Sequence, residues 1–260
     1  MKKILLIMLA FSLIFLTGCS SDKKAAKNQV ASIIERDYII IGVKTDSKPF
    51  GFIDKKTGDN VGFDIDIAKN IANDILGSDR KIKYVPVTPS SKIEAIMSGE
   101  VDIVIATMSV TPQRQFLVDF SEPYYIAGQS ALVREDSDIY NFTDLKKKTT
   151  IVVLGSTAEE NMRKILPTAK LSGFKNYEEA FAAFKEGKAD AISTDNTILS
   201  GFEMDNKGYR ILKNKISQEP YAVGFKRNED DESLKKAINI SIHRMQRDGT
   251  INELKKKWKC

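Results

Sequence analysis

The chain has 260 residues, of which 29% are charged and 42% are apolar, and its formal charge is +5 at neutral pH. This composition is typical of a globular protein with one large or two modest cores. Acidic and basic residues are mixed along the chain, which excludes a nucleic-acid binder because such proteins concentrate basic residues on one face. With only Cys19 and Cys260 available, no cysteine metal cluster can form, and we expect no metal and no cofactor.

The first 18 residues predict a signal peptide. Lys2 and Lys3 precede an uncharged apolar run over residues 4–16, and the run ends in Leu16-Thr17-Gly18-Cys19, a lipoprotein cleavage box. A run of 13 residues is too short to cross a hydrocarbon layer of ~30 Å, which takes about 20 residues. The segment is therefore a processing signal and not a transmembrane helix.

Cleavage before Cys19 would make its thiol the attachment point for a lipid. Residues 20–27 are mostly Ser, Asp, Lys and Ala, which offer little to a buried helix. We predict that residues 19–36 comprise the lipidated cysteine and a flexible tether, which places the protein outside the cytoplasm on the cell membrane.

From residue 38 onward, β-rich apolar stretches alternate with amphipathic helical ones. Strands are predicted at residues 39–43, 82–87, 103–106, 151–154 and 191–193. Residues 64–76 place apolar side chains three and four apart, which is the spacing of one helix face. Repeated alternation of strand and helix predicts an α/β fold with mostly parallel sheets covered by helices.

Two segments of the chain share one pattern. Residues 95–107 and 181–194 both run from a helix through Gly, two residues and Asp into a short apolar strand that ends in Thr. Their glycines, Gly99 and Gly187, are 88 residues apart, so the copies belong to separate lobes. Ligands bind at the carboxyl ends of strands in such sheets, and two similar lobes predict a binding cleft between them.

Several helix starts contain a capping residue with Glu three positions later, which satisfies free backbone donors. The expected pairs are Ser91 with Glu94, Thr157 with Glu160, Asn176 with Glu179 and Thr250 with Glu253. Helices are expected to end at Gly99, Gly187 and Gly249.

Polar residues at strand ends are the candidate ligand contacts. Thr107, Ser109 and Arg114 follow the strand at 103–106. A guanidinium group can hold a carboxylate through two parallel charge-assisted hydrogen bonds, with hydroxyl and backbone groups beside it. An arginine on a surface turn is the alternative interpretation.

The second lobe offers two further candidates. Gly155-Ser156-Thr157 follows the strand at 151–154 and opens a helix, whose free N–H groups and dipole favour a carboxylate. A plain helix cap is the alternative, and both roles can hold together. Asp195 directly follows Thr194, where its carboxylate could balance an ammonium group or simply cap the next helix.

These segments together resemble the family 3 solute-binding proteins, which are polar amino acid receptors of ABC importers with the type II periplasmic binding protein fold. The matching segments are residues 42–46, Val61-Gly62-Phe63-Asp64-Ile65-Asp66, residues 99–102, Thr111-Pro112-Gln113-Arg114, Asp119-Phe120-Ser121-Glu122-Pro123-Tyr124-Tyr125, residues 155–160 and Thr194-Asp195. They extend over nearly all of residues 39–258 in the family's order. The family commonly has Glu at the position of Gln113, a change that should not affect carboxylate binding.

The resemblance implies roles for the candidate residues. Arg114 would bind the α-carboxylate of a free amino acid, and Asp195 would bind its α-ammonium. The carboxylate would also contact Thr107, Ser109 and Thr157. No cofactor is implied, and the expected partners are the ligand and the membrane permease subunits, with the protein itself a monomer.

The resemblance also implies two crossover hinge strands, expected near residues 125–128 and 219–222. They would separate lobe 1 (residues 37–126 and 222–260) from lobe 2 (residues 127–221). Closure of the lobes on the ligand is the change that a permease would detect.

Side-chain specificity is less constrained by the sequence. Asp46, Phe50 and Phe52 follow the first strand, where relatives line the side-chain pocket, while Lys44 and Lys92 match positions that are basic in some receptors for acidic amino acids. Both lysines could instead be surface residues. Leu154 stands where glutamine receptors often have Lys, so glutamine, glutamate, aspartate and asparagine all stay open.

Two rival functions fit the same fold. Some relatives of this fold are dehydratases of cyclic amino acid precursors, which need a general acid over the ligand. The available groups are Glu122, Glu203 and His243, but His243 lies in a helical pattern near the C-terminus, and we expect no enzyme. A ligand-sensing partner of a membrane receptor is the second alternative.

Overall fold

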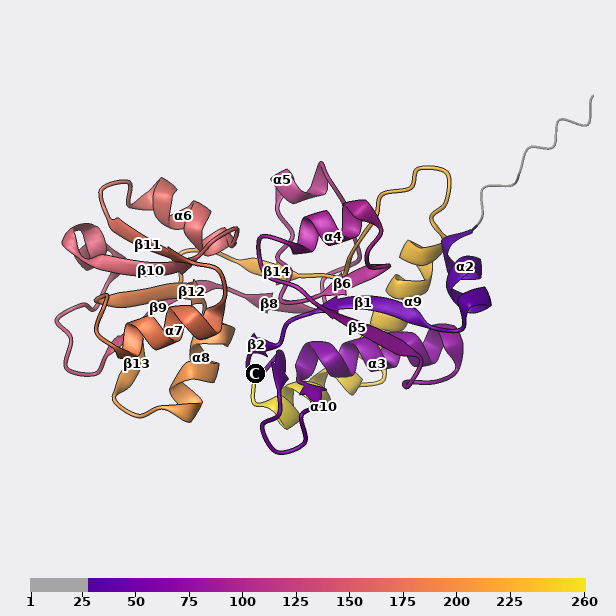
Figure 1. The fold of residues 1–260 in the computed structure, drawn as a ribbon, viewed down its shortest axis with the longest axis horizontal. Helices are drawn as coiled ribbons and strands as arrows, with labels where there is room; N and C mark the ends of the chain where they lie inside the picture. Colours follow the sequence, from indigo (N-terminus) through magenta and orange to yellow (C-terminus); the bar gives the residue numbers. More distant parts are fainter. Residues whose placement is uncertain (1–27) are drawn as a thin grey trace, which may run out of the picture.

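The computed structural model describes residues 28–260 and folds them into two lobes joined by a pair of strands (Figure 1). The predicted signal peptide, Cys19 and the tether up to residue 27 lie outside the described residues.

Lobe 1 is built around a five-stranded sheet in the order β5-β1-β6-β15-β7. Its strands are β1 (Ile39–Val43), β5 (Ile82–Pro86), β6 (Ile103–Ile105), β7 (Asp119–Phe120) and β15 (Gly224–Phe225). A three-stranded sheet of β2 (Asp46–Ser47), β3 (Gly51–Ile53) and β4 (Asn60–Val61) follows β1. The helices are α2 (Gln29–Arg36), α3 (Phe63–Leu76), α4 (Lys92–Ser98), α5 (Pro112–Gln115), α9 (Ser233–Arg247) and α10 (Thr250–Trp258).

Lobe 2 repeats the plan with a sheet in the order β11-β10-β12-β9-β13. Its strands are β9 (Gln129–Arg134), β10 (Thr149–Val153), β11 (Lys170–Phe174), β12 (Ala191–Asp195) and β13 (Tyr209–Ile211). Three helices and a 3-10 turn cover the sheet: α6 (Thr157–Ile165), α7 (Tyr177–Lys185), α8 (Asn196–Asp205) and η1 (Phe142–Lys147). The predicted α/β fold with two lobes is confirmed.

Both sheets are mixed, and not mostly parallel as predicted. The central pairs, β1 with β5 and β6 and β10 with β11 and β12, are parallel. The pairs that involve β9, β13, β7 and β15 are antiparallel. In the sequence, these antiparallel strands lie directly before or after the two segments that cross between the lobes.

The two lobes are connected through β8 (Tyr125–Ala127) and β14 (Glu219–Tyr221), which pair with each other in antiparallel fashion. Figure 1 shows both strands crossing between the lobes. They lie where the resemblance predicts the crossover strands. The predicted divisions at 126/127 and 221/222 fall within β8 and at the end of β14. Tyr221, the last residue of β14, packs in the core of lobe 1 and is counted with that lobe.

Helix α3 shows how the sequence produces the core. Its apolar residues recur at helical spacing, and Phe63, Ile67 and Ile71 are fully buried against the sheet of lobe 1. Complete burial of such a side chain contributes roughly 1.5–3 kcal/mol. The helix ends at Gly77, whose φ of 68° is the left-handed conformation that glycine adopts readily.

The flexible tether predicted up to residue 36 is wrong for residues 29–36, which form α2. Asn28 caps this helix, Ile33 is buried in the core of lobe 1, and the Gln29 N–H donates to Asp231 Oδ2 at 2.6 Å. The helix is stabilised by its contact with α9, which is distant in sequence. The composition of this segment alone therefore does not predict the helix.

The helix caps differ in part from the predicted ones. Asn176 accepts a hydrogen bond from the Glu179 N–H as expected. At α6, however, Ser156 is the capping residue and Thr157 is the first helical residue. The side chains of Ser91 and Thr250 cap neither α4 nor α10. The predicted helix starts are correct to within one residue: the caps expected at Thr157 and Thr250 lie one residue earlier, at Ser156 and Gly249.

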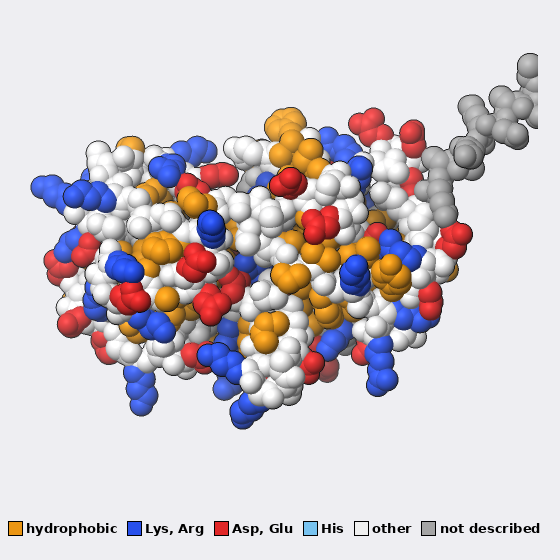
Figure 2. All heavy atoms as spheres, viewed as in Figure 1, with side chains coloured by type: hydrophobic (Ala, Val, Ile, Leu, Met, Phe, Trp, Pro, Cys, Tyr) orange, Lys and Arg blue, Asp and Glu red, His pale blue; other side chains and the backbone are white. Residues whose placement is uncertain are grey.

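Acidic and basic side chains are intermixed on the face drawn in Figure 2. Within residues 28–260, none of the helices has the length and apolar character to cross a bilayer. The same residues contain no cluster of His, Cys, Asp or Glu suited to a metal ion.

Candidate functional site

A small cavity lies between the lobes, with about 230 Å³ of atom-free space. Its lining residues are Pro89, Lys92, Thr107, Ser109, Arg114, Ser156, Thr157, Tyr177 and Asp195. All of these except Pro89 and Tyr177 are candidates from the sequence. They come together because the carboxyl ends of β6 in lobe 1 and of β10 and β12 in lobe 2 face the cavity, as expected for ligand sites in such sheets.

Arg114 is the cationic group on α5. Thr111 caps this helix, Pro112 is its first residue, and the Arg114 side chain is only 8% exposed. Its Nη1 donates to the carbonyl of Ser109 at 2.9 Å, and its Nη2 donates across the lobes to the carbonyl of Gly155 at 3.3 Å. A guanidinium has five N–H donors. Three of them therefore have no hydrogen-bond partner among the described residues and can serve a ligand.

Thr107 is held in an unusual backbone conformation. Its φ of 44° is in the left-handed region, which costs a β-branched residue about 1–3 kcal/mol. Asp64, fully buried on α3, accepts a hydrogen bond from the Thr107 N–H at 2.7 Å and one from the Tyr124 hydroxyl at 2.8 Å. Burial raises the pKa of Asp64 to about 6, although these bonds act against the rise. Asp64 thus maintains the turn that shapes one wall of the cavity.

Lys92 is a second buried cation, in the first turn of α4. It is 4% exposed, so the alternative of a surface residue is wrong. Its Nζ donates to the carbonyl of Thr107 at 3.5 Å, and it forms no ion pair within residues 28–260. Burial lowers the pKa of Lys92 well below its usual value, and the nearby charges of Arg114 and Lys44 lower it further.

Asp195 faces these cations from the end of β12. It occupies the N-cap position of α8, yet its side chain makes no capping bond. Its Oδ2 accepts a hydrogen bond from the Tyr221 hydroxyl at 2.6 Å, while its Oδ1 is buried without a hydrogen-bond partner in the described part of the chain. Burial raises the pKa of Asp195 to about 6. A buried acceptor without a partner is uncommon in folded proteins.

The start of α6 forms the wall opposite Arg114. The Ser156 hydroxyl accepts from the Glu159 N–H at 3.2 Å, so the helix cap that was the alternative interpretation is present. Thr157 begins the helix and is buried, at the positive end of the helix dipole. Both Ser156 and Thr157 line the cavity.

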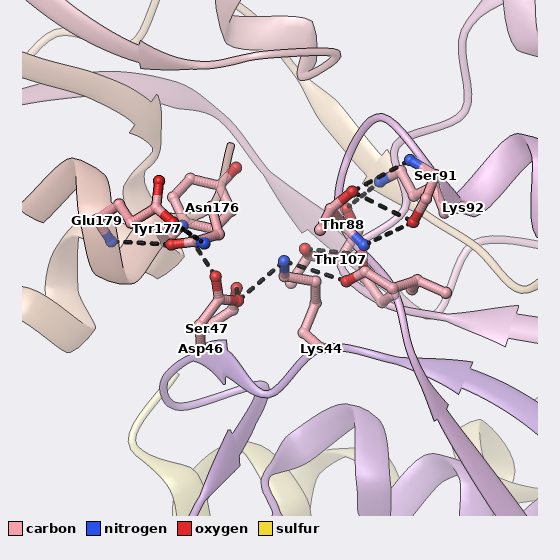
Figure 3. A network of polar contacts seen from close by, with 12 residues as sticks. Lys44, Asp46, Ser47, Thr88, Ser91, Lys92, Thr107, Asn176, Tyr177 and Glu179 are labelled. Carbon is pink, nitrogen blue, oxygen red and sulfur yellow. Dashed lines mark hydrogen bonds and ion pairs between the residues drawn. The ribbon is translucent and has the colours of Figure 1, made fainter. Parts of the chain in front are cut away.

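Four of the predicted side-chain pocket residues do not line the cavity. Lys44 is buried, and its Nζ pairs with Asp46 Oδ1 at 2.8 Å; the other Asp46 oxygen accepts from the Tyr177 N–H of lobe 2 at 2.8 Å (Figure 3). The Phe50 ring turns into the core of lobe 1, 5.2 Å from Phe63. Phe52 and Trp258 pack together with ring centroids 5.9 Å apart.

Three residues at the site were missed as individual candidates: Asp64, Tyr177 and Tyr221. Asp64 has a detectable signal, since it is an acidic residue on the buried face of a helix. Tyr177 follows the capping Asn176 and donates to or accepts from the Thr194 hydroxyl at 3.0 Å. Nothing local distinguishes Tyr221, because its role depends on a contact with Asp195 across the lobes.

Comparison with known proteins identifies the family. The sequence profile of the bacterial extracellular solute-binding proteins, family 3, matches residues 39–259. The chain belongs to this family. The resemblance predicted from its motifs is confirmed, and so is the prediction of a binding protein in place of an enzyme.

Individual relatives of this solute-binding protein agree. It is 40% identical to the ABC transporter glutamine-binding protein GlnH of Bacillus subtilis, over 99% of this chain and 97% of that protein. It is 43% identical to a glutamine-binding protein of Geobacillus stearothermophilus, with 79% of each chain covered. The crystal structure of a cysteine-binding protein from Campylobacter jejuni superposes with a TM-score of 0.85 at 32% identity, covering 89% of this chain and 92% of the other.

Proposed function

We propose that this protein captures a polar L-amino acid in the interlobe cavity, outside the cytoplasm, and delivers it to the permease of an ABC importer. The observation that carries the proposal is the buried Asp195 Oδ1, which has no hydrogen-bond partner among the described residues. It shares a cavity with two buried cations, Lys92 and Arg114. An amino acid zwitterion supplies the ammonium and carboxylate groups that these side chains need.

The proposed contacts divide the ligand between the lobes. Arg114 holds the α-carboxylate with its remaining N–H donors, supported by Thr107, Ser109, Ser156 and Thr157 around the cavity. Asp195 holds the α-ammonium through Oδ1. Since Arg114 belongs to lobe 1 and Asp195 to lobe 2, a bound ligand joins the lobes directly.

Lys92 is the proposed contact for the ligand side chain. Once Arg114 and Asp195 have neutralised the zwitterion, Lys92 is the remaining charge of the cavity lining. Its ammonium matches a side-chain oxygen, which both glutamine and glutamate carry. The two glutamine-binding relatives favour L-glutamine, and the unpaired charge of Lys92 makes L-glutamate the second candidate.

Contacts across the cleft support closure as the transport signal. Arg114 bonds the carbonyl of Gly155, and Asp46 bonds the N–H of Tyr177, so the structure is a closed form of the two lobes. Residues near the hinge strands would absorb the motion, and the permease would distinguish the closed form from the open one.

Calorimetric titration with L-glutamine and L-glutamate tests these assignments. Arg114→Lys keeps the charge but loses the bidentate geometry of the guanidinium, and should weaken the binding of both ligands by at least about tenfold. Lys92→Met should weaken glutamate by roughly 10- to 100-fold and glutamine by about tenfold or less, because a hydrogen bond between charged groups is the stronger one. Unchanged binding by the Arg114 variant would refute the carboxylate site. Equal losses in the Lys92 variant would refute the side-chain assignment.

We also propose that the protein is a monomer held at the cell membrane by a lipid on Cys19. The proposed anchor depends on the sequence of the leader and its cleavage box.

A further inference from the structure

Tyr221 is the last residue of hinge strand β14, and its backbone belongs to lobe 1. Its carbonyl accepts from the Tyr124 N–H at 2.9 Å, and it forms a bridge with Ser109, whose carbonyl orients Arg114. The fully buried ring lies 5.5 Å from Phe50 and 5.9 Å from Tyr125. The position of the ring is therefore fixed by the core of lobe 1.

The hydroxyl of Tyr221 reaches into lobe 2. It lies 2.6 Å from Asp195 Oδ2 and 2.9 Å from the Thr197 hydroxyl. Burial raises the pKa of Tyr221 well above its usual value, so the phenol keeps its proton. An ionised carboxylate only accepts, and a phenol has one proton to donate. Tyr221 therefore donates to Asp195 and accepts from Thr197.

This arrangement leaves the two oxygens of Asp195 unequal. Oδ2 is occupied by the phenol, and Oδ1 is buried with no partner in residues 28–260. We propose that Tyr221 is a positioning residue for ligand binding: it fixes the Asp195 carboxylate so that Oδ1 meets the ligand ammonium, and it links that carboxylate to the hinge. The inference rests on the proposed binding of an amino acid at Asp195.

The charge of Asp195 depends on several groups around it. Glu219 on β14 raises the pKa of Asp195 in addition to burial, and the Tyr221 hydrogen bond, Lys92 on α4 and Arg114 on α5 lower it. Tyr177 on α7 also interacts with this carboxylate. Because the ammonium needs the ionised form, loss of the phenol should raise the pKa of Asp195 and restrict tight binding to higher pH.

Tyr221→Phe tests the proposal because it keeps the ring and removes only the hydroxyl. Tyr125→Phe is the matched control, since Tyr125 stacks on Tyr221 in the partner hinge strand and makes no hydrogen bond to Asp195. Binding of L-glutamine and L-glutamate is measured by calorimetry from pH 5 to 9, with thermal unfolding of each variant as the check on folding.

We expect Tyr221→Phe to bind about 10- to 100-fold more weakly at pH 7, as for loss of a hydrogen bond to a charged group. The loss should shrink as the pH rises, because the midpoint of the affinity profile moves upward. Tyr125→Phe should follow the wild-type profile. A loss in Tyr221→Phe that is constant across pH, or no loss, would overturn the inference alone. Unchanged binding by Asp195→Asn would overturn the proposed site and the inference with it.

Discussion

Asp195 has opposite effects on binding and on stability. Its pKa is raised from 3.8 to about 6, so the folded protein binds more protons than the unfolded chain between these values. Stability therefore falls as the pH rises from about 4 to 6, and at neutral pH the charged group costs up to about 3 kcal/mol. A ligand ammonium would offset this cost.

Asp195→Asn removes the buried charge but keeps an oxygen for the Tyr221 hydroxyl. We expect the free energy of unfolding of the unliganded protein to increase by about 1–3 kcal/mol at pH 7 and to change little at pH 4. Urea denaturation at the two pH values measures the difference.

Asp64→Asn is the contrasting control for this prediction. The pKa of Asp64 is also raised to about 6, but both of its oxygens accept hydrogen bonds, from Thr107 and Tyr124. An amide offers one acceptor in place of two, so this variant should be less stable at pH 7. A less stable Asp195→Asn protein would contradict the argument.

The sequence predicted the residues at the ends of strands better than those in the following loop. Arg114 and Asp195 line the cavity because the strands that precede them, β6 in lobe 1 and β12 in lobe 2, have carboxyl ends that face the cleft between the lobes. Phe50 and Phe52 lie in a loop whose small sheet, β2 to β4, folds back on lobe 1 and turns the rings toward Phe63 and Trp258. The direction of a loop side chain depends on such contacts, and local patterns do not encode it.

At the scale of elements, helix α8 meets the opposite lobe at Gly201. A Cβ placed on Gly201 would lie 2.0 Å from the carbonyl oxygen of Lys48, a residue of lobe 1. The same region carries an ion pair between Lys48 and Asp205, 2.5 Å apart. Glycine inside a helix costs roughly 1 kcal/mol relative to alanine. Glycine at this position therefore makes the helix less stable but lets the two lobes approach closely.

Gly201→Ala should therefore separate closure from folding. We expect the unliganded protein to be as stable as the wild type or more stable by up to about 1 kcal/mol, and ligand affinity to fall by about tenfold or more. Small-angle scattering with and without ligand measures the contraction on closure, which the variant should lack. Ser200→Ala on the same helix is the control and should close normally. Full closure by the Gly201 variant would contradict the proposed contact.

The central strands and α3 were predicted to within a few residues because buried apolar runs and helical spacing are local properties. The antiparallel strands β9, β13 and β15 were not predicted. Their pairing partners are remote in sequence, and β13 and β15 are only three and two residues long. Strands as short as β13 and β15 are defined by the sheet that they join, so a single sequence cannot reveal them.

At the scale of the whole molecule, each lobe has its own hydrophobic cores, and the chain crosses between the lobes at β8 and β14. The C-terminal helices α9 and α10 return to lobe 1 and pack on α3. Closure can therefore proceed as a rigid-body rotation that leaves both sets of cores intact. A ligand between Arg114 and Asp195 would favour the closed arrangement without repacking either lobe.

The position of α2 bears on the proposed membrane anchor. Figure 1 shows α2 at the end of lobe 1 that faces away from lobe 2. Its Gln29 N–H and the preceding Asn28 bond to Asp231 and Ser233 at the start of α9, which fixes where the described chain begins. An attachment that precedes Asn28 would leave this end of the protein and not the cleft.

Cys19→Ser tests the anchor, because a hydroxyl cannot replace the thiol that accepts the lipid. We expect the variant to leave the membrane fraction and to bind the ligand as tightly as the wild type, since the cavity is formed by residues 89–195. Each buried methylene of an acyl chain contributes about 0.8 kcal/mol to membrane binding, so loss of the lipid should release nearly all of the protein. Cys260→Ser, which changes the other cysteine, is the matched control and should stay with the membrane. A Cys19→Ser protein that still sediments with membranes would show that something other than this thiol holds it there.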